Sequence, residues 1–227
     1  LEPVIRNGGD KGPGYYSSNK DIDADAPLPD EFGGIMQATR EIVDMIDKMD
    51  GLTPSSAARS CRDIKLQDHD ASDGVYWIDP DWGSHGNAFQ ARCKFTLQET
   101  CINSTKSNKD EKFVYADEIQ VKFLRLLSVS VYQRITYHCK NSMAFDGKQN
   151  SINLIGENEI FNMNSRSKYR PMIIQDDCKI SDGVWHKTIF EVRTPQKELL
   201  PIIKVKPFDT GLDKEYRIEA GGVCFVW

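Results

Sequence analysis

Six cysteines constrain the fold of this chain more than any other feature of its sequence. They stand at positions 61, 93, 101, 139, 178 and 224, and no two of them are separated by only two residues. Structural zinc sites usually draw their cysteines in close Cys-x-x-Cys pairs. The spacing therefore indicates disulfides rather than zinc, although six cysteines allow 15 pairings and spacing alone selects none of them.

Residues 75–87 form the segment with the most chemical information. An apolar, strand-like run, Val75-Tyr76-Trp77-Ile78, leads directly into Asp79-Pro80-Asp81-Trp82-Gly83-Ser84-His85-Gly86-Asn87. Oxygen-bearing side chains recur in the second part, where the proline and the glycines favour tight turns. Hard cations such as calcium prefer six to eight oxygen ligands, which such a loop can supply. Solvated acidic turns are equally compatible, and the spacing is not that of an EF-hand.

Charge and motif content disfavour several functions. Charged residues make up 28% of the chain and its formal net charge is −5, without a concentrated basic patch, so we expect no nucleic-acid partner. No apolar run approaches the length of a membrane span, and no apolar leader segment is visible in LEPVIRNGGDKG at the start. The four histidines form no HExxH motif, and GxSxG and phosphate-loop motifs are missing. We therefore expect no catalytic residues, and a metal-dependent hydrolase is disfavoured.

The amino-terminal part consists of a polar segment followed by a segment with a helical apolar pattern. Residues 1–30 are rich in Gly, Pro, Ser, Asn and Asp, which predicts a flexible or extended segment. Apolar residues then recur at alternating spacings of three and four, which is the a/d pattern of a coiled coil. These seam positions are Ile35, Ala38, Ile42, Met45, Met49 and Leu52. The pattern predicts a short coiled-coil stalk within 31–56, and a helix packed on its own domain is the alternative. Thr53-Pro54-Ser55-Ser56 is expected to end the helix.

Residues 57–227 are predicted to form an α+β globular domain. Short strands are expected at 94–97, 112–115, 133–138, 188–193 and 202–205. Residues 119–130 have a helical apolar pattern, and the less regular segment 140–155 is a candidate second helix. Trp77 and Trp185 are expected in the core, because an exposed pair of tryptophans is unusual.

Several longer sequence clusters resemble a known family. They are CRDIK, DGVYWIDP, ETC at 99–101, FLRLLS at 123–128, ITYHCKNSMA at 135–144, WHKTIFEVRT at 185–194, LPI at 200–202 and GGVCF at 221–225. In this order they resemble the carboxy-terminal propeptide of fibrillar procollagens, over residues 57–227. The resemblance implies a secreted protein of the extracellular matrix with a disulfide-stapled mixed α/β domain, fibrinogen-like in character, behind a coiled-coil stalk.

The function implied by this resemblance is assembly. Three propeptides associate and set the register for triple-helix nucleation, because tethering makes the search between chains effectively intramolecular. The phrase DGVYWID and the acidic loop are also similar to fibrinogen-related domains. The alternative function is therefore a calcium-dependent, lectin-like recognition domain.

The resemblance also implies the disulfide pairing and the oligomeric state. The pairs are Cys61–Cys93, Cys101–Cys224 and Cys139–Cys178. The family usually has eight cysteines, and the two that link neighbouring chains are replaced here, one within 65–68 and one by Ser84. Only 21 residues separate Cys101 from Phe123, where the family has a longer segment used in chain selection. We therefore expect a non-covalent homotrimer.

The calcium ligands are likewise taken from the resemblance. Asp79, Asp81 and Asn87 are expected to contribute side-chain oxygens, and Trp82 and Ser84 backbone carbonyls, for one structural calcium ion per chain. The family usually has Asn and Gln at the positions of Asp81 and Trp82, and Asp at the position of Asn87. The exchange moves one carboxylate without changing the number of carboxylates.

Three further sites concern modification. Asn103-Ser104-Thr105 is an N-glycosylation acceptor in a polar run that should be exposed. Lys11 lies in a segment that resembles a telopeptide, where the family oxidises a lysine for cross-linking, although a simple solvated lysine is the alternative. Ala24-Asp25 fits the cleavage preference of procollagen C-proteinases of the astacin/tolloid type, and an ordinary acidic linker is the alternative.

Overall fold

The computed structural model describes residues 30–46, 48–83, 85–104, 112–145, 151–163 and 170–227. The chain separates into two units, residues 1–42 and residues 43–227. The predicted sites at Lys11, Ala24, Asp25 and Ser84 lie outside the described residues.

The first described element is α1, a helix that covers Asp30–Ile46. Its apolar side chains Ile35 and Ile42 are 62% and 49% exposed. A helix is therefore present where the stalk is predicted, but it ends earlier than the heptad pattern predicts.

The seam prediction is wrong for Met49 and Leu52, which lie beyond the end of this helix. Met49 is buried in the globular unit, where it belongs to an apolar cluster that includes Cys61 and Cys93, and Leu52 is exposed in a bend. Gly51 has a positive φ of 68° and Asp50 accepts a hydrogen bond from the Leu52 amide, so the chain turns here.

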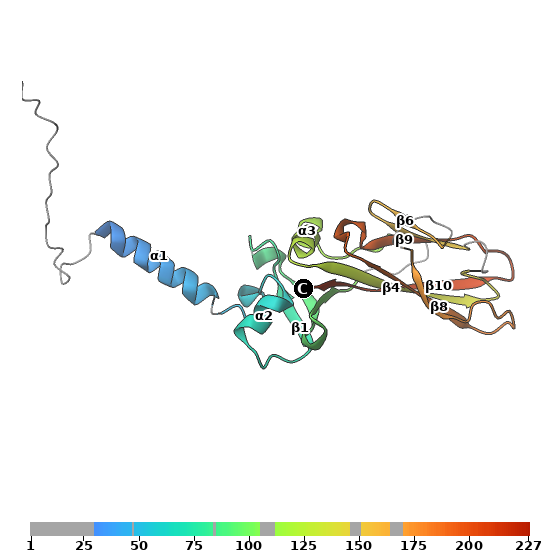
Figure 1. Ribbon diagram of the computed structural model, residues 1–227, viewed down its shortest axis with the longest axis horizontal. Coiled ribbons are helices and arrows are strands. Elements are labelled where there is room, and N and C mark those ends of the chain that lie inside the picture. Colours follow the sequence, from blue (N-terminus) through green and yellow to red (C-terminus); the bar gives the residue numbers. More distant parts are fainter. Residues whose placement is uncertain (1–29, 47, 84, 105–111, 146–150, 164–169) are drawn as a thin grey trace, which may run out of the picture. The chain divides into compact units, whose positions relative to one another are not determined.

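Two antiparallel sheets make up the globular unit (Figure 1). The larger sheet has the order β1 (Gly74–Ile78), β2 (Phe89–Lys94), β3 (Glu99–Ile102), β10 (Glu215–Val226), β4 (Ser130–Lys140), β8 (His186–Thr194) and β7 (Met172–Asp176). The smaller sheet has the order β6 (Ile160–Phe161), β5 (Ile152–Gly156) and β9 (Ile202–Pro207). The mixed α/β prediction is confirmed, with most of the strands in one antiparallel sheet.

Two helices accompany the sheets, α2 (Cys61–Gln67) and α3 (Glu118–Leu126). The Asp117 carboxylate caps α3 by accepting a hydrogen bond from the Ile119 amide at 2.8 Å. Short 3₁₀ turns cover Pro54–Ser56 (η1), His85–Asn87 (η2), Phe95–Leu97 (η3) and Lys197–Leu199 (η4). The helix predicted at 119–130 is therefore present but ends at Leu126, because β4 begins at Ser130.

Three other local predictions need correction. Residues 94–97 form the end of β2 and a 3₁₀ turn rather than a strand. Residues 112–115 are not in a named strand, although the Phe113 amide donates to the Ile203 carbonyl at 2.8 Å. The helix proposed for 140–155 is wrong, because β4 ends at Lys140 and β5 begins at Ile152.

The main core lies where β4 and β8 of the large sheet contribute inward side chains that pack with the small sheet. Alternate residues of β4, including Ile135 and Tyr137, are fully buried, and they share one cluster with Phe190, Leu154 and Ile202. The prediction of two core tryptophans is wrong for Trp185, which is 49% exposed, and Trp77 is only partly buried.

Three disulfides join Cys61 to Cys93, Cys101 to Cys224 and Cys139 to Cys178. This is the pairing that the resemblance implies, and no cysteine is free. The Cys61–Cys93 bridge closes a separation of 32 residues and holds α2 against the end of β2. In the chain-entropy model, a disulfide that closes a loop of that length raises the free energy of unfolding by about 3–4 kcal/mol.

Candidate calcium loop and the polar cluster at the last strand

The predicted calcium loop connects β1 to β2. The Asp79 amide donates to the Ala58 carbonyl at 2.7 Å, which fixes the start of the loop to the segment before α2. The Trp82 amide donates to the Asp79 carbonyl at 3.0 Å, and Trp82 has a φ of 51°, in the left-handed region that non-glycine residues seldom adopt. The loop thus begins with a tight, hydrogen-bonded turn that leaves the Trp82 side chain exposed.

The carboxylates of Asp79 and Asp81 meet at one residue of α3. Gln120 Nε2 donates to Asp79 Oδ1 at 2.9 Å and to Asp81 Oδ1 at 2.8 Å, while Gln120 Oε1 accepts from the Asp81 amide at 3.2 Å. Both Asp79 and Gln120 are fully buried. Gln120 is the residue of this site that the sequence did not reveal; the only signal was a polar side chain between Ile119 and Val121 on a helix.

Asn87 completes the cluster of predicted side-chain ligands. Its Nδ2 lies 3.4 Å from Asp81 Oδ2, so Asn87 contacts Asp81, which in turn is hydrogen-bonded to Asp79. A hydrogen bond with the Asp79 carboxyl lowers the pKa of Asp81, and burial opposes this effect. Trp82 lies in the same turn.

This group of side chains fits a hard cation. Carboxylate oxygens are ligands that calcium prefers, and two carboxylates placed together repel each other unless a cation or shared proton lies between them. The amide groups of Gln120 and Asn87 face these carboxylates with their nitrogen atoms. Asp79 and Asp81 would hold the ion directly. Asn87 would present its amide oxygen after a half-turn of its side-chain amide, which leaves its shape unchanged.

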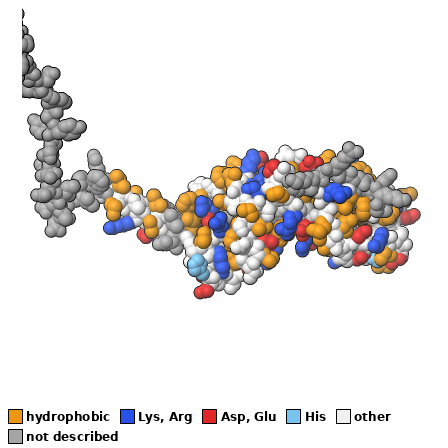
Figure 2. Space-filling view, in the orientation of Figure 1, with side chains coloured by type: hydrophobic (Ala, Val, Ile, Leu, Met, Phe, Trp, Pro, Cys, Tyr) orange, Lys and Arg blue, Asp and Glu red, His pale blue; other side chains and the backbone are white. Residues whose placement is uncertain are grey.

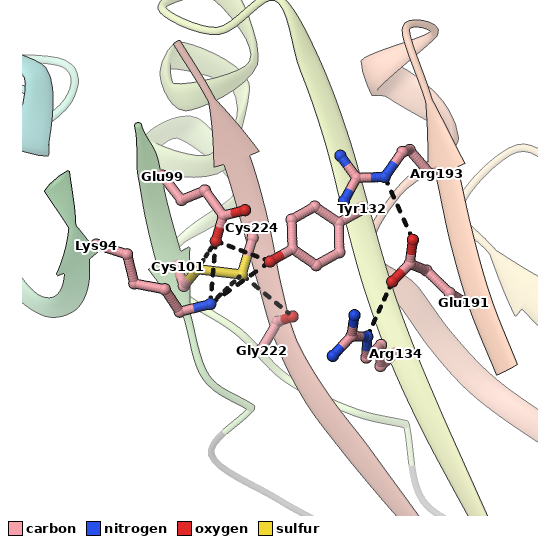
Figure 3. Close-up of polar contacts among 9 residues, drawn as sticks. All are labelled: Lys94, Glu99, Cys101, Tyr132, Arg134, Glu191, Arg193, Gly222 and Cys224. Atoms are coloured by element: carbon pink, nitrogen blue, oxygen red, sulfur yellow. Dashed lines mark hydrogen bonds and ion pairs between the residues drawn. A yellow bond between two sulfur atoms is a disulfide. The ribbon is translucent and has the colours of Figure 1, made fainter. Parts of the chain in front are cut away.

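A second polar cluster surrounds the Cys101–Cys224 disulfide (Figure 3). Glu99 accepts hydrogen bonds from Lys94 Nζ at 3.0 Å and from the Tyr132 hydroxyl at 2.7 Å. Burial lowers the pKa of Lys94, but the hydrogen bond and charge of Glu99 outweigh it, so the pKa is raised. Glu99 lies near both sulfur atoms. Because both cysteines are oxidised in this disulfide, the cluster is structural and not a metal centre.

The same network continues across β4 and β8. The Arg193 guanidinium lies 4.1 Å from the centre of the Tyr132 ring, and buried Glu191 forms ion pairs with Arg193 at 3.3 Å and Arg134 at 2.8 Å (Figure 3). These contacts connect β2, β3, β4 and β8 of the large sheet through charged pairs and a cation–π contact, and the Cys101–Cys224 disulfide joins β10 to β3 beside them.

The remaining predicted sites are surface features. Ile35, Ala38 and Ile42 are exposed on α1, whereas the side chain of Met45 lies outside the described residues. Asn103 is exposed just after β3, which is compatible with the predicted glycan. Among the described helices, none is both long enough and apolar enough to cross a membrane.

Comparisons with known proteins place the chain in a family. The family model described as "Fibrillar collagen C-terminal domain" matches residues 30–118 and 108–225. The Collagen alpha-2(I) chain of Oncorhynchus mykiss is 35% identical over 216 residues, which cover 77% of this chain and 16% of that protein. The Collagen alpha-1(II) chain of Xenopus tropicalis is 32% identical over 91% of this chain and 16% of its own length.

A third relative, the Collagen alpha-1(I) chain of Gallus gallus, is 30% identical over 99% of this chain and 18% of its own length. The chain therefore spans less than a fifth of each of these relatives. The family match runs from residue 30, where α1 begins, to residue 225, one residue before β10 ends. The chain belongs to the fibrillar collagen C-terminal domain family.

Proposed function

We propose that this chain is the trimerisation module of a fibrillar procollagen. It is a structural module and not an enzyme, and domains of its family generally direct chain association. The observation that carries the proposal is the family match across almost the whole chain. Three associated copies would hold three collagen chains at one end and set their register, because tethering raises the effective concentration of each chain for the others.

The stalk supports this proposal. A single 17-residue helix is marginally stable in water, and α1 leaves Ile35 and Ile42 exposed. Packing these side chains against two equivalent helices would bury them at a gain of about 25 cal/mol per Å² of apolar surface. The stalk is therefore expected to fold fully only in the assembled protein.

Calcium is the second part of the proposal. One ion per chain is held by the side chains of Asp79, Asp81 and Asn87 together with the backbone carbonyls of Trp82 and Ser84. Gln120 connects this site to α3, since its amide contacts both carboxylates. When bound, calcium neutralises two clustered carboxylates and stabilises the loop.

Assembly without covalent links is the third part. All six cysteines form disulfides within the chain, so no thiol remains to join one subunit to another. A homotrimer is the simplest assembly of this kind. We further propose secretion to the extracellular matrix, cleavage by a procollagen C-proteinase at Ala24-Asp25, and cross-linking through Lys11.

Light scattering on the purified chain tests the proposal. In millimolar calcium the mass should be three times the 25.8 kDa of one chain. A single-chain mass across the micromolar range would contradict it. Titration of the calcium-free protein with calcium should show one ion bound per chain.

A further inference from the structure

Three basic side chains form a row across adjacent strands of the large sheet, on the face opposite to the main core. Lys187 of β8 lies directly opposite His138 of β4, and His138 lies directly opposite Arg217 of β10. Successive side chains of a strand point to opposite faces, and Tyr137 and Cys139 on either side of His138 are buried in the main core. The row therefore faces outward, where Lys187 and Arg217 are exposed and His138 is half-buried. We refer to these three residues as the basic row.

Such a row of like charges is unfavourable without an anion. Cross-strand neighbours have Cβ atoms about 4.5–5.5 Å apart, and like charges in these positions repel each other. Glu219 offsets part of this repulsion, because its carboxylate lies 3.2 Å from His138 Nε2. Lys187 and Arg217 have no carboxylate partner among the described residues, so both remain available to a ligand. On the face of the globular unit shown in Figure 2, basic and acidic side chains are interspersed, so a row of cations alone is an exception on this surface.

A hollow with an aromatic wall lies on the basic row. It has a volume of about 370 Å³, and the described residues that line it are His138, Trp185 and Arg217. Trp185 is the residue before β8 and stands two positions before Lys187, which places its side chain on the same face of the sheet. Half of Trp185 is exposed. Exposed tryptophans are enriched at binding surfaces, because the indole offers a large apolar face and a polar N–H group.

The width of the basic row indicates the class of ligand. Neighbouring strands lie about 4.8 Å apart, so the backbones of Lys187 and Arg217, two strands apart, are separated by about 9.6 Å. A single small anion would need both long side chains to converge on it. A chain that carries anionic groups at intervals contacts each cation in its own place, and the Trp185 ring then packs against the part of the chain between those groups.

We propose that the basic row and Trp185 bind a sulfated polysaccharide. Its sulfate groups stay ionised at neutral pH, and the planar Arg217 guanidinium can donate two parallel hydrogen bonds to the oxygens of one of them. The apolar face of a sugar ring packs on the Trp185 indole, which an acidic peptide such as poly-glutamate does not offer. This surface contains no residue of the candidate calcium loop, α1 or α3, so the inference stands apart from the proposed trimerisation.

Binding of the full chain to immobilised heparin, a sulfated polysaccharide, tests the proposal. The unmodified chain should bind heparin, and salt should release it, since the contacts join exposed charges. Lys187→Ala/Arg217→Ala should weaken binding by about tenfold or more, and Trp185→Ala by about threefold or more. The matched control is Arg62→Ala/Lys206→Ala, which removes one arginine and one lysine from exposed positions of α2 and β9. Its affinity for heparin should stay within about twofold of the unmodified chain.

Further measurements separate this site from a loss of folding or a general charge effect. Lys187→Arg/Arg217→Lys keeps both charges and should retain most of the binding. Thermal melting of Lys187→Ala/Arg217→Ala should begin no earlier than that of the unmodified chain, because the substitutions relieve repulsion. Light scattering should give the same mass for every variant, so that all affinities refer to one state of assembly.

The competing ligands decide the outcome. Chemically desulfated heparin should bind much more weakly than heparin, and poly-glutamate should compete poorly. The proposal is overturned if the unmodified chain does not bind heparin, or if Lys187→Ala/Arg217→Ala binds as tightly as Arg62→Ala/Lys206→Ala. It is also overturned if poly-glutamate competes as well as heparin, because the site would then recognise acidic peptides.

Discussion

Replacement of Gln120 is the most informative perturbation of the candidate calcium loop. The Gln120 side chain is fully buried and makes two hydrogen bonds to carboxylates and one to a backbone amide. Hydrogen bonds to charged groups contribute about 1.5–3 kcal/mol each. Leucine has a similar volume and recovers part of this loss through burial. We therefore expect Gln120→Leu to lower the free energy of unfolding by about 3 kcal/mol, which corresponds to about 6–12 °C for a domain of this size.

Urea unfolding at one fixed chain concentration, with the disulfides intact, measures this difference. A fixed concentration is needed because association adds to the apparent stability. The control is Gln90→Leu, because Gln90 is exposed on β2, and it should change the stability by less than about 0.5 kcal/mol. A Gln120→Leu protein as stable as the unmodified chain would refute the role of Gln120.

A second substitution separates a calcium site from a structural hydrogen-bond network. Gln120→Glu places a third carboxyl group beside Asp79 and Asp81, so repulsion should destabilise the calcium-free protein at pH 7. Added calcium should restore a large part of that loss in Gln120→Glu but not in Gln120→Leu. Equal effects of calcium on both variants would mean that the ion does not bind near Gln120.

Three further predictions follow from the same contacts. Asp79→Ala/Asp81→Ala should abolish the calcium-dependent rise in melting temperature that the exposed control Asp70→Ala retains; an unchanged calcium response in the double variant would reject the ligand assignment. On a non-reducing denaturing gel the protein should run as a single chain, and a disulfide-linked oligomer would contradict the intrachain pairing. Burial raises the pKa of Tyr137 to about 12. The raised pKa stabilises the folded chain fully at pH values below 10. Between pH 10 and pH 12 Tyr137 ionises in the unfolded chain but not in the folded chain, so the free energy of unfolding should fall by about 2–3 kcal/mol over this range. Urea unfolding at pH 9 and at pH 11.5 measures this fall, which should be smaller in Tyr137→Phe than in the unmodified chain. An identical fall in both proteins would show that Tyr137 does not cause it.

Local patterns in the sequence predicted some elements and misjudged others for identifiable reasons. The 119–130 pattern predicted a helix of the right type, because its apolar residues recur at helical spacing. The spacing did not predict which side is buried, since Ile119, Phe123 and Leu126 are exposed. The seam prediction continued to Met49 and Leu52 because a spacing of three and four does not distinguish a coiled-coil position from a core position. Met49 fills the cluster around the Cys61–Cys93 disulfide instead.

The candidate site was predicted only in part, because its residues come from distant segments. Asp79, Asp81 and Asn87 lie within one loop, so their grouping could be expected. Gln120 lies 41 residues after Asp79, and only the packing of α3 against the loop brings the two together. The disulfide pairing came from resemblance to a family, since spacing left the alternatives open. No periodicity indicated that Trp185 is exposed.

The central claim is a non-covalent, calcium-dependent trimer, and light scattering of the full chain with and without calcium tests it most directly. The account predicts three times the mass of one chain in calcium, and a shift toward the 25.8 kDa single chain at low micromolar concentration after chelation. The same samples should run as single chains on a non-reducing denaturing gel. A calcium-loaded protein that stays a single chain at micromolar concentration would contradict the account.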